Sequence, residues 1–551
     1  MVTGASLAWE TTPADVSTSH STQTQQDSQE MAAADASVHT EERTLADLEN
    51  GMDAFVLSPS QRSQTIHFTL PPNADTTEAW LRLAARPASE TTSGRIHVSV
   101  NGGDAITVRP QPQPMEARFA LFSADFQPGE NTLSIEFSSD AATAGWIVDA
   151  RRSQLRLSLT ASNQLGSLQE LERTLAADFA APRRIALISE DNRARATVES
   201  LVAQGLALRA GAVPIFTGDS QNADLVVRIA AGTALDEADR DALRNGQPGG
   251  PEIALSAGET PRLIVTGRNA DEATAAARLF AARSFAGYDT TFIASDAISA
   301  QRLGTRQARD ADRLAQNADL RTFATSGLPF SADQGSRTAV QIIGTSEADR
   351  FGALSVLSRA ALVGGEAWLY AWYGNGVTDA PTDHNLLVIG PNSTDHAAVN
   401  RAAPAEFHAA LRAAERSQGQ RGLMRLAAAA YAAPAEASEG DTANIGVASI
   451  FSDRNGRTIA TMTAPDMASF EAAGRSLARS DLWIALEGRA AVWSARGVTP
   501  IDFRVEAPTL QDRVQEFALD HTRDAAIILF GLAFLMLLRG MWHRRRRVHA
   551  S

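Results

Sequence analysis

The side chains that could carry out chemistry are few in this sequence, and they do not assemble into a catalytic motif. Asp383 and His384 are the nearest acid–base pair, but they precede a predicted strand in "TDHNLLVIG" and fit a turn better than a catalytic centre. No GxGxxG follows a predicted strand, and no GxxxxGK[ST] loop, HExxH motif or GxSxG elbow occurs. The absence of cysteine excludes disulfides and thiolate chemistry. We therefore expect no catalytic residue, no metal site and no cofactor.

Tryptophan is the residue type that points to a ligand. Sugar rings stack on aromatic faces, because their C–H surfaces are apolar while their rims form hydrogen bonds. Among the eight tryptophans, Trp146 follows the small-residue loop "AATAG", and it is the candidate carbohydrate contact. The alternative is that Trp146 belongs to a core. Trp80 lies in an alternating strand and is expected in the core.

Short alternating runs predict a β-sandwich over residues 54–160. In "SQTIHFTL" the apolar residues Ile66, Phe68 and Leu70 occupy every second position, as in a half-buried strand. Further runs of this kind are separated by "NGG" and "PGEN", which are turn sequences. Several short strands at such spacing are typical of a sandwich.

Strands and helices alternate after the sandwich. The strand "RRIALIS" and the helical "RATVESLVAQGLALRAGAV" open an α/β domain with a mainly parallel sheet over 165–295. Residues 296–335 have no clear sheet pattern and are interpreted as a linker. A second α/β domain follows over 336–505, and the similar order of its elements makes the two domains candidate internal relatives.

The amino-terminal residues 1–53 are predicted to form a solvated, disordered lead-in to the sandwich. They are rich in Ser, Thr, Gln, Asp and Glu, a composition that cannot bury a core. The stretch "GASLAWE" resembles the end of a signal peptide, with small residues near a cleavage point. We expect a disordered lead-in that carries the remnant of an export signal.

An apolar stretch near the carboxyl terminus predicts a transmembrane helix over 525–542. A membrane helix needs about 20 apolar residues. Arg539 lies near one end, where its side chain can reach the headgroups, and Trp542 lies where aromatic belts form. The alternative is a carboxyl-terminal core helix with a basic tail. Residues 508–524 before it predict an amphipathic helix at the membrane surface.

The tail 543–551 sets the predicted orientation. Basic clusters flank membrane helices on the cytoplasmic side. We therefore expect the tail in the cytoplasm and the bulk of the chain in the periplasm, anchored to the inner membrane. The residues that carry this expectation are Arg544, Arg545, Arg546 and Arg547.

The apolar stretch also has small residues that suit a membrane partner. Ala526, Phe530 and Ala533 lie at i, i+4 and i+7, which form one stripe of a helix. Gly531 lies beside this stripe, and small residues let helices approach closely in lipid. These four residues are the candidate packing surface for a membrane protein. A simple tether is the alternative.

The charge balance of the chain argues against nucleic acid as a partner. Lysine and arginine number 50 and aspartate and glutamate 64, so the net charge is −14. Nucleic-acid binding requires clustered positive charge, and the strong basic cluster here is the tail. We expect no nucleic-acid partner.

The order of these segments resembles one family. The motifs "IHVSVNGGDAITV", "ARFALFSADFQPGENTLSIEF" and "AGWIVDARRSQLRLSL" are similar to the first carbohydrate-binding sandwich of the B subunit of bacterial cellulose synthase. "RRIALIS" and "PRLIVTGRNADEATAAARLFA" resemble its first flavodoxin-like domain, and "HNLLVIGPNS" and "LWIALEGRAAVWS" resemble its last. The family has a second sandwich between those domains, for which this chain has only "DLRTFATSGLPFSAD". The chain would be a shortened member.

The resemblance implies a fold and a function. The fold would be a β-sandwich, two flavodoxin-like α/β domains and a carboxyl-terminal transmembrane helix. The function would be that of a non-catalytic periplasmic subunit, which receives the nascent β-glucan from a membrane-embedded processive glucosyltransferase. Cyclic di-GMP comes with the family label only, since no convincing RxxxR and [DN]xSxxG reader pair is found. The alternatives are a membrane-tethered, exported glycan-acting enzyme and a generic carbohydrate-binding module of the envelope.

The predicted topology can be tested with reporter fusions. A reporter that is active only in the periplasm should be active when it is fused before Gln511, and silent when it is fused after Ser551. Reversed signals would show that the arginine cluster does not set the orientation.

Overall fold

The computed structural model describes residues 37–501 with gaps. The gaps are residues 50, 89–93, 110–112, 142–143, 162–164, 191–192, 257, 259, 283, 286, 289, 294–317, 345, 377–379, 416–444 and 466–469. The described residues, except Ile501, belong to one compact unit. None of their helices is both long enough and apolar enough to cross a membrane.

The predicted carboxyl-terminal segments lie outside the described residues. These segments are the interface helix 508–524, the transmembrane helix 525–542 and the tail 543–551. The same is true of the candidate packing residues and the arginine cluster, namely Ala526, Phe530, Gly531, Ala533, Arg544, Arg545, Arg546 and Arg547.

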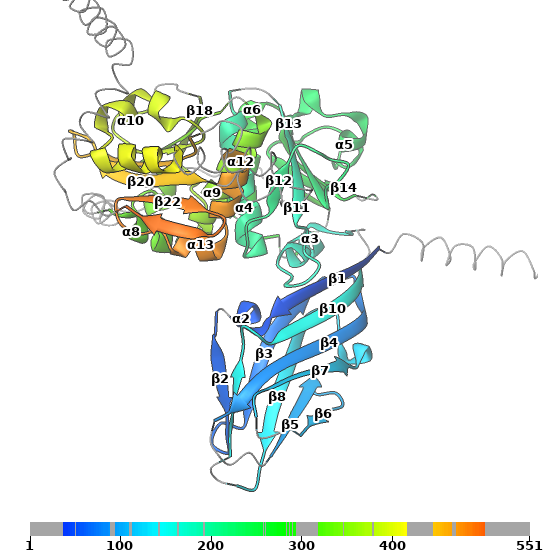
Figure 1. Cartoon of the computed structure of the whole chain (residues 1–551). Helices are drawn as coiled ribbons and strands as arrows, with labels where there is room; N and C mark the ends of the chain where they lie inside the picture. Colours follow the sequence, from blue (N-terminus) through cyan, green and yellow to red (C-terminus); the bar gives the residue numbers. More distant parts are fainter. Residues whose placement is uncertain are drawn as a thin grey trace, which may run out of the picture. The chain divides into compact units, whose positions relative to one another are not determined.

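Two antiparallel sheets form the sandwich, which is blue and cyan in Figure 1. The first sheet has the order β1 (Ser37–Thr44), β10 (Gln154–Ala161), β4 (Ala74–Pro87), β9 (Trp146–Asp149), β2 (Ala54–Leu57), and β7 (Met115–Leu121) also pairs with β4. The second has the order β3 (Ser63–Leu70), β8 (Gly129–Ser138), β5 (Arg95–Val100), β6 (Ile106–Val108). The core between them consists of alternate strand residues, among them Leu81, Leu83, Ile96, Val98, Leu133, Ile135, Leu155 and Leu157. This part of the chain has the predicted sandwich architecture.

The sandwich begins earlier than the sequence predicts. Residues 37–49, expected in the disordered lead-in, form β1 and the short helix α2 (Leu45–Leu48). Eight residue pairs join β1 to β10, from Ser37 opposite Ala161 to Thr44 opposite Gln154. The strand is polar and lies at the edge of its sheet, so backbone pairing rather than an apolar pattern defines it. The lead-in prediction is therefore wrong for these residues.

The two turn motifs of the sandwich meet in one hydrogen-bond network. The Asn101 amide nitrogen donates to Asn131 Oδ1 at 2.8 Å, and the Asn131 amide donates to the carbonyls of Gln127 and Gly129 at 2.7 and 2.9 Å. The Gln127 N–H also donates to Asn131 Oδ1. Asn131 is buried, so its side chain satisfies backbone groups that water does not reach. Asn101 and Asn131 therefore connect the two turns, which together form one corner of the sandwich.

The first α/β domain, green in Figure 1, is built on a six-stranded mixed sheet. Its order is β12 (Ile215–Thr217), β11 (Arg184–Ser189), β13 (Leu225–Ala231), β15 (Arg262–Gly267), β14 (Glu252–Ser256), β16 (Thr291–Ile293). Strand β14 runs antiparallel to β15 and β16. The helices are α3 (Leu168–Leu175), α4 (Arg195–Ala210), α5 (Glu237–Asp241) and α6 (Ala270–Ala282).

The second α/β domain repeats this topology. Its order is β18 (Trp372–Asn375), β17 (Thr338–Ile342), β19 (Asn385–Ile389), β21 (Thr458–Thr463), β20 (Gly446–Ser452), β22 (Ala490–Ser494), β23 (Gly497–Pro500). Counted within each domain, the first sheet has the order 2-1-3-5-4-6 and the second has the order 2-1-3-5-4-6-7, and the fourth strand of each is antiparallel to its neighbours. The first three positions match the flavodoxin-like order, and the remainder departs from its 2-1-3-4-5. The helices include α8 (Leu320–Ser326), α9 (Glu347–Gly364), α10 (Ala397–Ala402), α12 (Phe470–Leu477) and α13 (Ser480–Ile484).

The end of the predicted linker belongs to this second domain. Helix α8 lies within 296–335, the segment that we interpreted as a linker. Phe323 of α8 and Phe330 after it are fully buried and pack edge to face. Their burial shows that the segment around α8 packs into this domain, so the linker prediction is wrong for residues 318–335.

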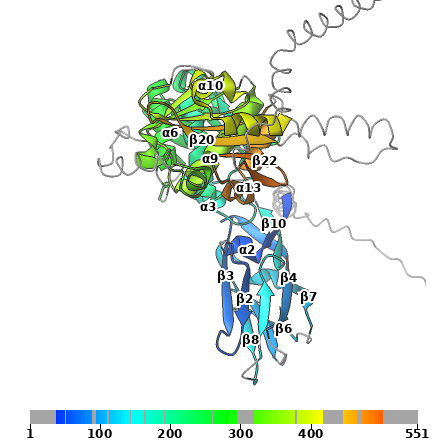
Figure 2. The ribbon, with the colours of Figure 1, turned by 60° about the vertical axis from the view of Figure 1, so that its left-hand side comes forward.

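Helices α4 and α9 join the two α/β domains, and Figure 1 shows them between the two sheets. Figure 2 shows α9 among the α/β elements from a second side. Both helices are buried over their middle turns, so neither shows an amphipathic stripe. Gly352 of α9 packs on Gly474 of α12 so closely that a Cβ on Gly474 would lie 2.6 Å from the Gly352 carbonyl oxygen. One hydrophobic cluster runs through both domains.

Two polar residues of α4, Glu199 and Gln204, have partners across this interface. The Gln204 amide on α4 donates to the Tyr373 hydroxyl at 3.0 Å and accepts from the backbone N–H of Trp368 at 2.8 Å. The buried Glu199 carboxylate lies 2.9 Å from Arg350 Nε of α9 and 3.2 Å from Arg195 Nε. These partners compensate the buried charge, because removing one of them would leave an unpaired charge in the interior.

The Asn131 network gives a test of the sandwich corner. Asn131→Ala should lower the free energy of unfolding by about 2–4 kcal/mol, because each buried group left without a partner costs about 1–3 kcal/mol. Chemical denaturation would measure this. Asn222→Ala, at an exposed asparagine with a side-chain bond to Asp219, is the matched control and should change stability by no more than about 0.5 kcal/mol. Equal effects of the two substitutions would contradict the account of the corner.

Candidate functional site

Trp146, the predicted carbohydrate contact, lies inside the sandwich. It is the first residue of β9, pairs with Leu57 and Pro87 on the flanking strands, and is 0% exposed. A ring without accessible surface cannot stack on a sugar, so Trp146 is a core residue here. The sequence already indicated that Trp146 is buried, because Trp146 and the apolar Val148 share one face of the strand, while Asp149 lies on the other face.

Trp80, which we expected in the core, lies on the outer face of the first sheet. Along β4 the residues Ala79, Leu81 and Leu83 are buried, while Glu78 and Arg82 are exposed and Trp80 is partly exposed. Trp80 thus shares the outward face with its charged neighbours two residues away on either side. This alternation was visible in the sequence and assigns Trp80 to the surface.

Strand β7 extends this face beside Trp80. Its outward residues alternate in step with those of β4, and Ala120 lies opposite Trp80. The guanidinium carbon of Arg118 lies 4.6 Å from the centre of the Trp80 ring. Phe122, one residue beyond the strand, continues the alternation in extended backbone and is 52% exposed. We call the following set the aromatic face: Glu78, Trp80, Arg82, Glu116, Arg118 and Phe122.

Hydrogen bonds and ion pairs connect the polar residues of the aromatic face. The Trp80 indole N–H donates to Glu78 Oε1 at 2.7 Å. Arg82 Nε donates to Glu116 Oε1 at 2.6 Å, and its Nη1 donates to Gln154 Oε1 at 3.1 Å. Two glutamates therefore balance two arginines, and the face carries both signs of charge without a net excess.

A groove of about 490 Å³ adjoins the aromatic face. It forms where β7 and β9 both reach Ala85, on the same edge of β4. Glu116 belongs to both the groove and the aromatic face, and Arg152 Nη2 approaches its Oε2 at 3.7 Å. The groove and the face together offer an apolar ring beside several hydrogen-bonding groups, an arrangement that suits a ligand with hydroxyl groups.

The Asp383–His384 pair lies directly before β19. His384 Nδ1 lies 2.9 Å from Asp383 Oδ1, and this hydrogen bond lowers the pKa of the Asp383 carboxyl. Asp383 is exposed, and the pair precedes β19 as the sequence indicates. Within the described ranges, no group of three or more His, Asp or Glu side chains is arranged to hold a metal ion.

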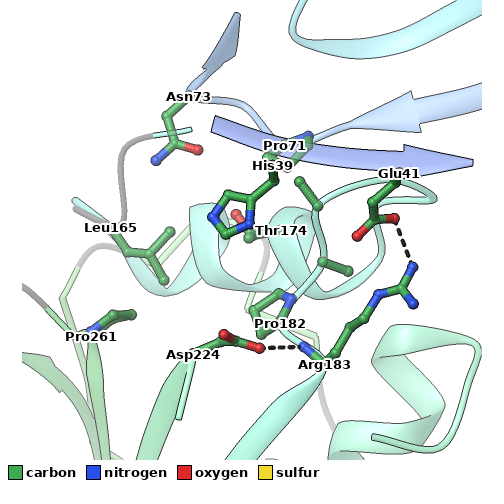
Figure 3. A pocket seen from close by; sticks show the side chains of 12 residues that line it. His39, Glu41, Pro71, Asn73, Leu165, Thr174, Pro182, Arg183, Asp224 and Pro261 are labelled. Carbon is green, nitrogen blue, oxygen red and sulfur yellow. Dashed lines mark hydrogen bonds and ion pairs between the residues drawn. The ribbon is translucent and has the colours of Figure 1, made fainter. Parts of the chain in front are cut away.

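A smaller pocket of about 240 Å³ lies where the sandwich meets the first α/β domain (Figure 3). Arg183 Nη2 donates to Glu41 Oε2 at 2.7 Å, and its backbone N–H donates to Asp224 at 2.9 Å. Much of the remaining lining is proline and alanine. The two Arg183 contacts drawn in Figure 3 connect β1 with the residue before β11 and with the residue before β13. We therefore assign the pocket a structural role.

The two tryptophans should respond differently to truncation. Trp146→Ala should lower the free energy of unfolding by about 3–5 kcal/mol, as expected for a large core side chain. Trp80→Ala should cost no more than about 1 kcal/mol, because it removes only cross-strand contacts on an outer face. Thermal or chemical denaturation of both variants gives the comparison. A larger loss for Trp80→Ala than for Trp146→Ala would reverse the assignment of the two faces.

Comparison with known proteins does not place the chain in a family. No family model matches it, and no curated protein matches it. Similar solved structures include a β-porphyranase of glycoside hydrolase family 86 from Bacteroides plebeius, at 18% identity over 23% of this chain and 22% of that chain, with a TM-score of 0.16. The CBM35 from Cellvibrio japonicus Abf62 is 14% identical over 20% of this chain and 96% of its own, with a TM-score of 0.14. The carbohydrate-binding module CBM36 in complex with calcium and xylotriose is 10% identical over 21% and 99%, with a TM-score of 0.15. At these TM-scores the similarities support no conclusion about what this chain binds.

Proposed function

We propose that this chain is a non-catalytic glycan-binding protein, and that the aromatic face of its sandwich contacts a neutral β-glucan. The observation that carries the proposal is an outward tryptophan, Trp80, surrounded by paired charges beside a groove. Ring stacking supplies affinity for the apolar side of a sugar, and the charged groups supply hydrogen bonds to its hydroxyl groups.

The spacing of the aromatic residues suits a chain of sugars rather than one. Phe122 follows Ala120 by two residues, and Ala120 lies opposite Trp80. Backbone positions that are diagonal neighbours in an antiparallel pair are about 7–8 Å apart. Aromatic side chains from positions at this spacing can contact successive units of one polysaccharide.

The charge balance favours a neutral glycan. Glu116 accepts from Arg82, and Glu78 accepts from the Trp80 indole, so the carboxylates of the face lie among its donors. A polyanionic polysaccharide would be repelled by these glutamates, while a polycation would be repelled by Arg82 and Arg118. Hydroxyl groups accept hydrogen bonds from arginine and donate them to carboxylates.

The cellular setting is proposed from the sequence. The predicted carboxyl-terminal helix and arginine tail would anchor the chain in an inner membrane, with the sandwich in the periplasm. There the chain would act as the B-type subunit of a cellulose synthase complex, beside a processive glucosyltransferase, and receive the emerging glucan. In this shortened member, residues 294–317 between the α/β domains lie outside the described part and are too few for a second sandwich. Cyclic di-GMP is connected with this proposal only through the label of the family, and we assign it no binding residues here.

Binding to a β-1,4-glucan tests the proposal. Trp80→Ala should weaken binding of cellohexaose about 5- to 30-fold, since loss of a central aromatic contact typically costs about 1–2 kcal/mol. Trp80→Phe should retain most of the affinity, because a ring remains at the site. Titration calorimetry on the full-length chain in detergent would measure both.

The matched control lies on another domain. Tyr288→Ala removes a partly exposed aromatic side chain of the first α/β domain and should leave cellohexaose binding unchanged. Wild-type affinity of the folded Trp80→Ala variant would exclude the aromatic face as the binding site. No measurable binding of the wild type to cellohexaose or to other neutral β-glucans would remove the proposal altogether.

A further inference from the structure

A second groove, of about 500 Å³, lies between the two α/β domains. The chain after α4 forms one side, where Val213 and Ile215 offer apolar surface. Helices α9 and α12 and the turn after α12 form the other side, and they contribute three arginines. We call it the arginine groove after these residues, Arg359, Arg475 and Arg479.

Positive charge exceeds negative charge at the arginine groove. Arg475 pairs with Glu471, and Arg479 Nη2 lies 2.6 Å from Asp481 Oδ2. Arg184 lies opposite Ile215 in the pairing of β11 with β12, and it acts electrostatically on Arg475. Arg184 also interacts electrostatically with Asp219, so four arginines gather around three carboxylates, in a chain whose net charge is −14.

Arg475 has hydrogen-bonding capacity left beside its pairing with Glu471. Burial lowers the pKa of Arg475, and the like charge of Arg184 lowers it further. Its Nε atom is buried and has no hydrogen-bond partner within the described structure. An anion in the groove would reduce the repulsion and could accept from the arginine side chains.

The repeated topology supplies an internal comparison. The corresponding groove on the other side of the α4–α9 pair lies where the chain after α9 passes α4 and α6. Its arginine, Arg209, lies 3.7 Å from Glu172 and stacks on the rings of Phe280 and Phe285. Glu366 also lines that groove. The two grooves share their construction, but only the arginine groove has a surplus of positive charge.

We propose that the arginine groove binds a small organic anion, with a phosphate or carboxylate group held by Arg475 and Arg479 and an apolar body against Val213 and Ile215. Guanidinium groups match the paired oxygens of both kinds of anion. The groove lies at a domain interface and has the volume of a small-molecule site, which is typically about 300–1,000 Å³. This site is separate from the aromatic face and does not depend on glycan binding.

Titration with simple probes tests the proposal. Phenyl phosphate and benzoate each carry an apolar ring and one anionic group, and benzyl alcohol is the uncharged counterpart. At least one of the two anions should bind the full-length chain, and benzyl alcohol should not. Arg475→Ala combined with Arg479→Ala should weaken that binding at least about tenfold, as expected for the loss of charge-assisted hydrogen bonds. Titration with inorganic phosphate separates recognition of the bare anion from recognition of the whole probe.

Two further variants make the result decisive. Arg479→Ala alone changes an exposed side chain paired to Asp481, so the fold should be retained and binding should still weaken. Arg321→Ala removes a similarly exposed arginine paired to Glu487 and should leave binding unchanged. Equal binding of both anionic probes to wild type and Arg479→Ala, or no binding of either to wild type, would overturn the proposal. Calorimetry gives the affinities, and circular dichroism confirms folding.

Discussion

Helices α4 and α9 pack against each other where the two α/β domains meet, and both are buried over most of their middle turns. This contact makes the two domains share one hydrophobic cluster. It also explains why α4 tolerates the buried polar residues Glu199 and Gln204, since each has its partners within the interface or across it. Removing one partner would leave a buried polar group unpaired, and this would destabilise the interface.

The repeated topology has a consequence beyond stability. Because each domain contributes the same elements to the α4–α9 contact, two related grooves arise, one at each side. In one of them Arg209 is compensated by Glu172 and by aromatic rings. In the other, arginines from three parts of the sequence gather with fewer carboxylates. A shared backbone thus supports different surface chemistry, which is why function has to be argued from the side chains and not from the fold.

The sandwich places its chemistry on an outer face. Its inner rows follow the alternation of Leu81 and Leu83, and its corner is held by Asn101 and Asn131. These features fix β4 and β7, so that Trp80 and Arg118 meet on the opposite side of the sheet. A rigid sheet with paired charges presents a preorganised surface, and little side-chain ordering is then needed when a ligand binds.

Much of the fold was predictable from sequence, because apolar periodicity reports burial. The alternation of Ile66, Phe68 and Leu70 and the strand–helix order after residue 165 correctly indicated a sandwich and α/β domains. Strand β1 was missed, since backbone pairing at a sheet edge leaves no apolar pattern. The antiparallel fourth strands were also missed, because strand direction depends on tertiary connections.

The candidate sites were harder to predict from the sequence than the fold. The orientations of Trp80 and Trp146 could have been derived from the charged and apolar residues two positions away. The partners of Trp80 could not, because Arg118 comes from a strand more than thirty residues further along the chain. The arginine groove combines Arg359 with Arg475 and Arg479, which only the packing of α9 on α12 brings together.

Hydroxyl-radical footprinting of the full-length chain, with and without cellohexaose, tests most directly whether the aromatic face is the glycan site. The modification rate of a side chain reports its exposure, so Trp80 and Phe122 should react in the free protein, while the buried Trp146 should not. With saturating cellohexaose, our account predicts slower modification of Trp80 and Phe122 and unchanged modification of Tyr288. Unchanged rates at both Trp80 and Phe122, with protection elsewhere in the chain, would contradict it.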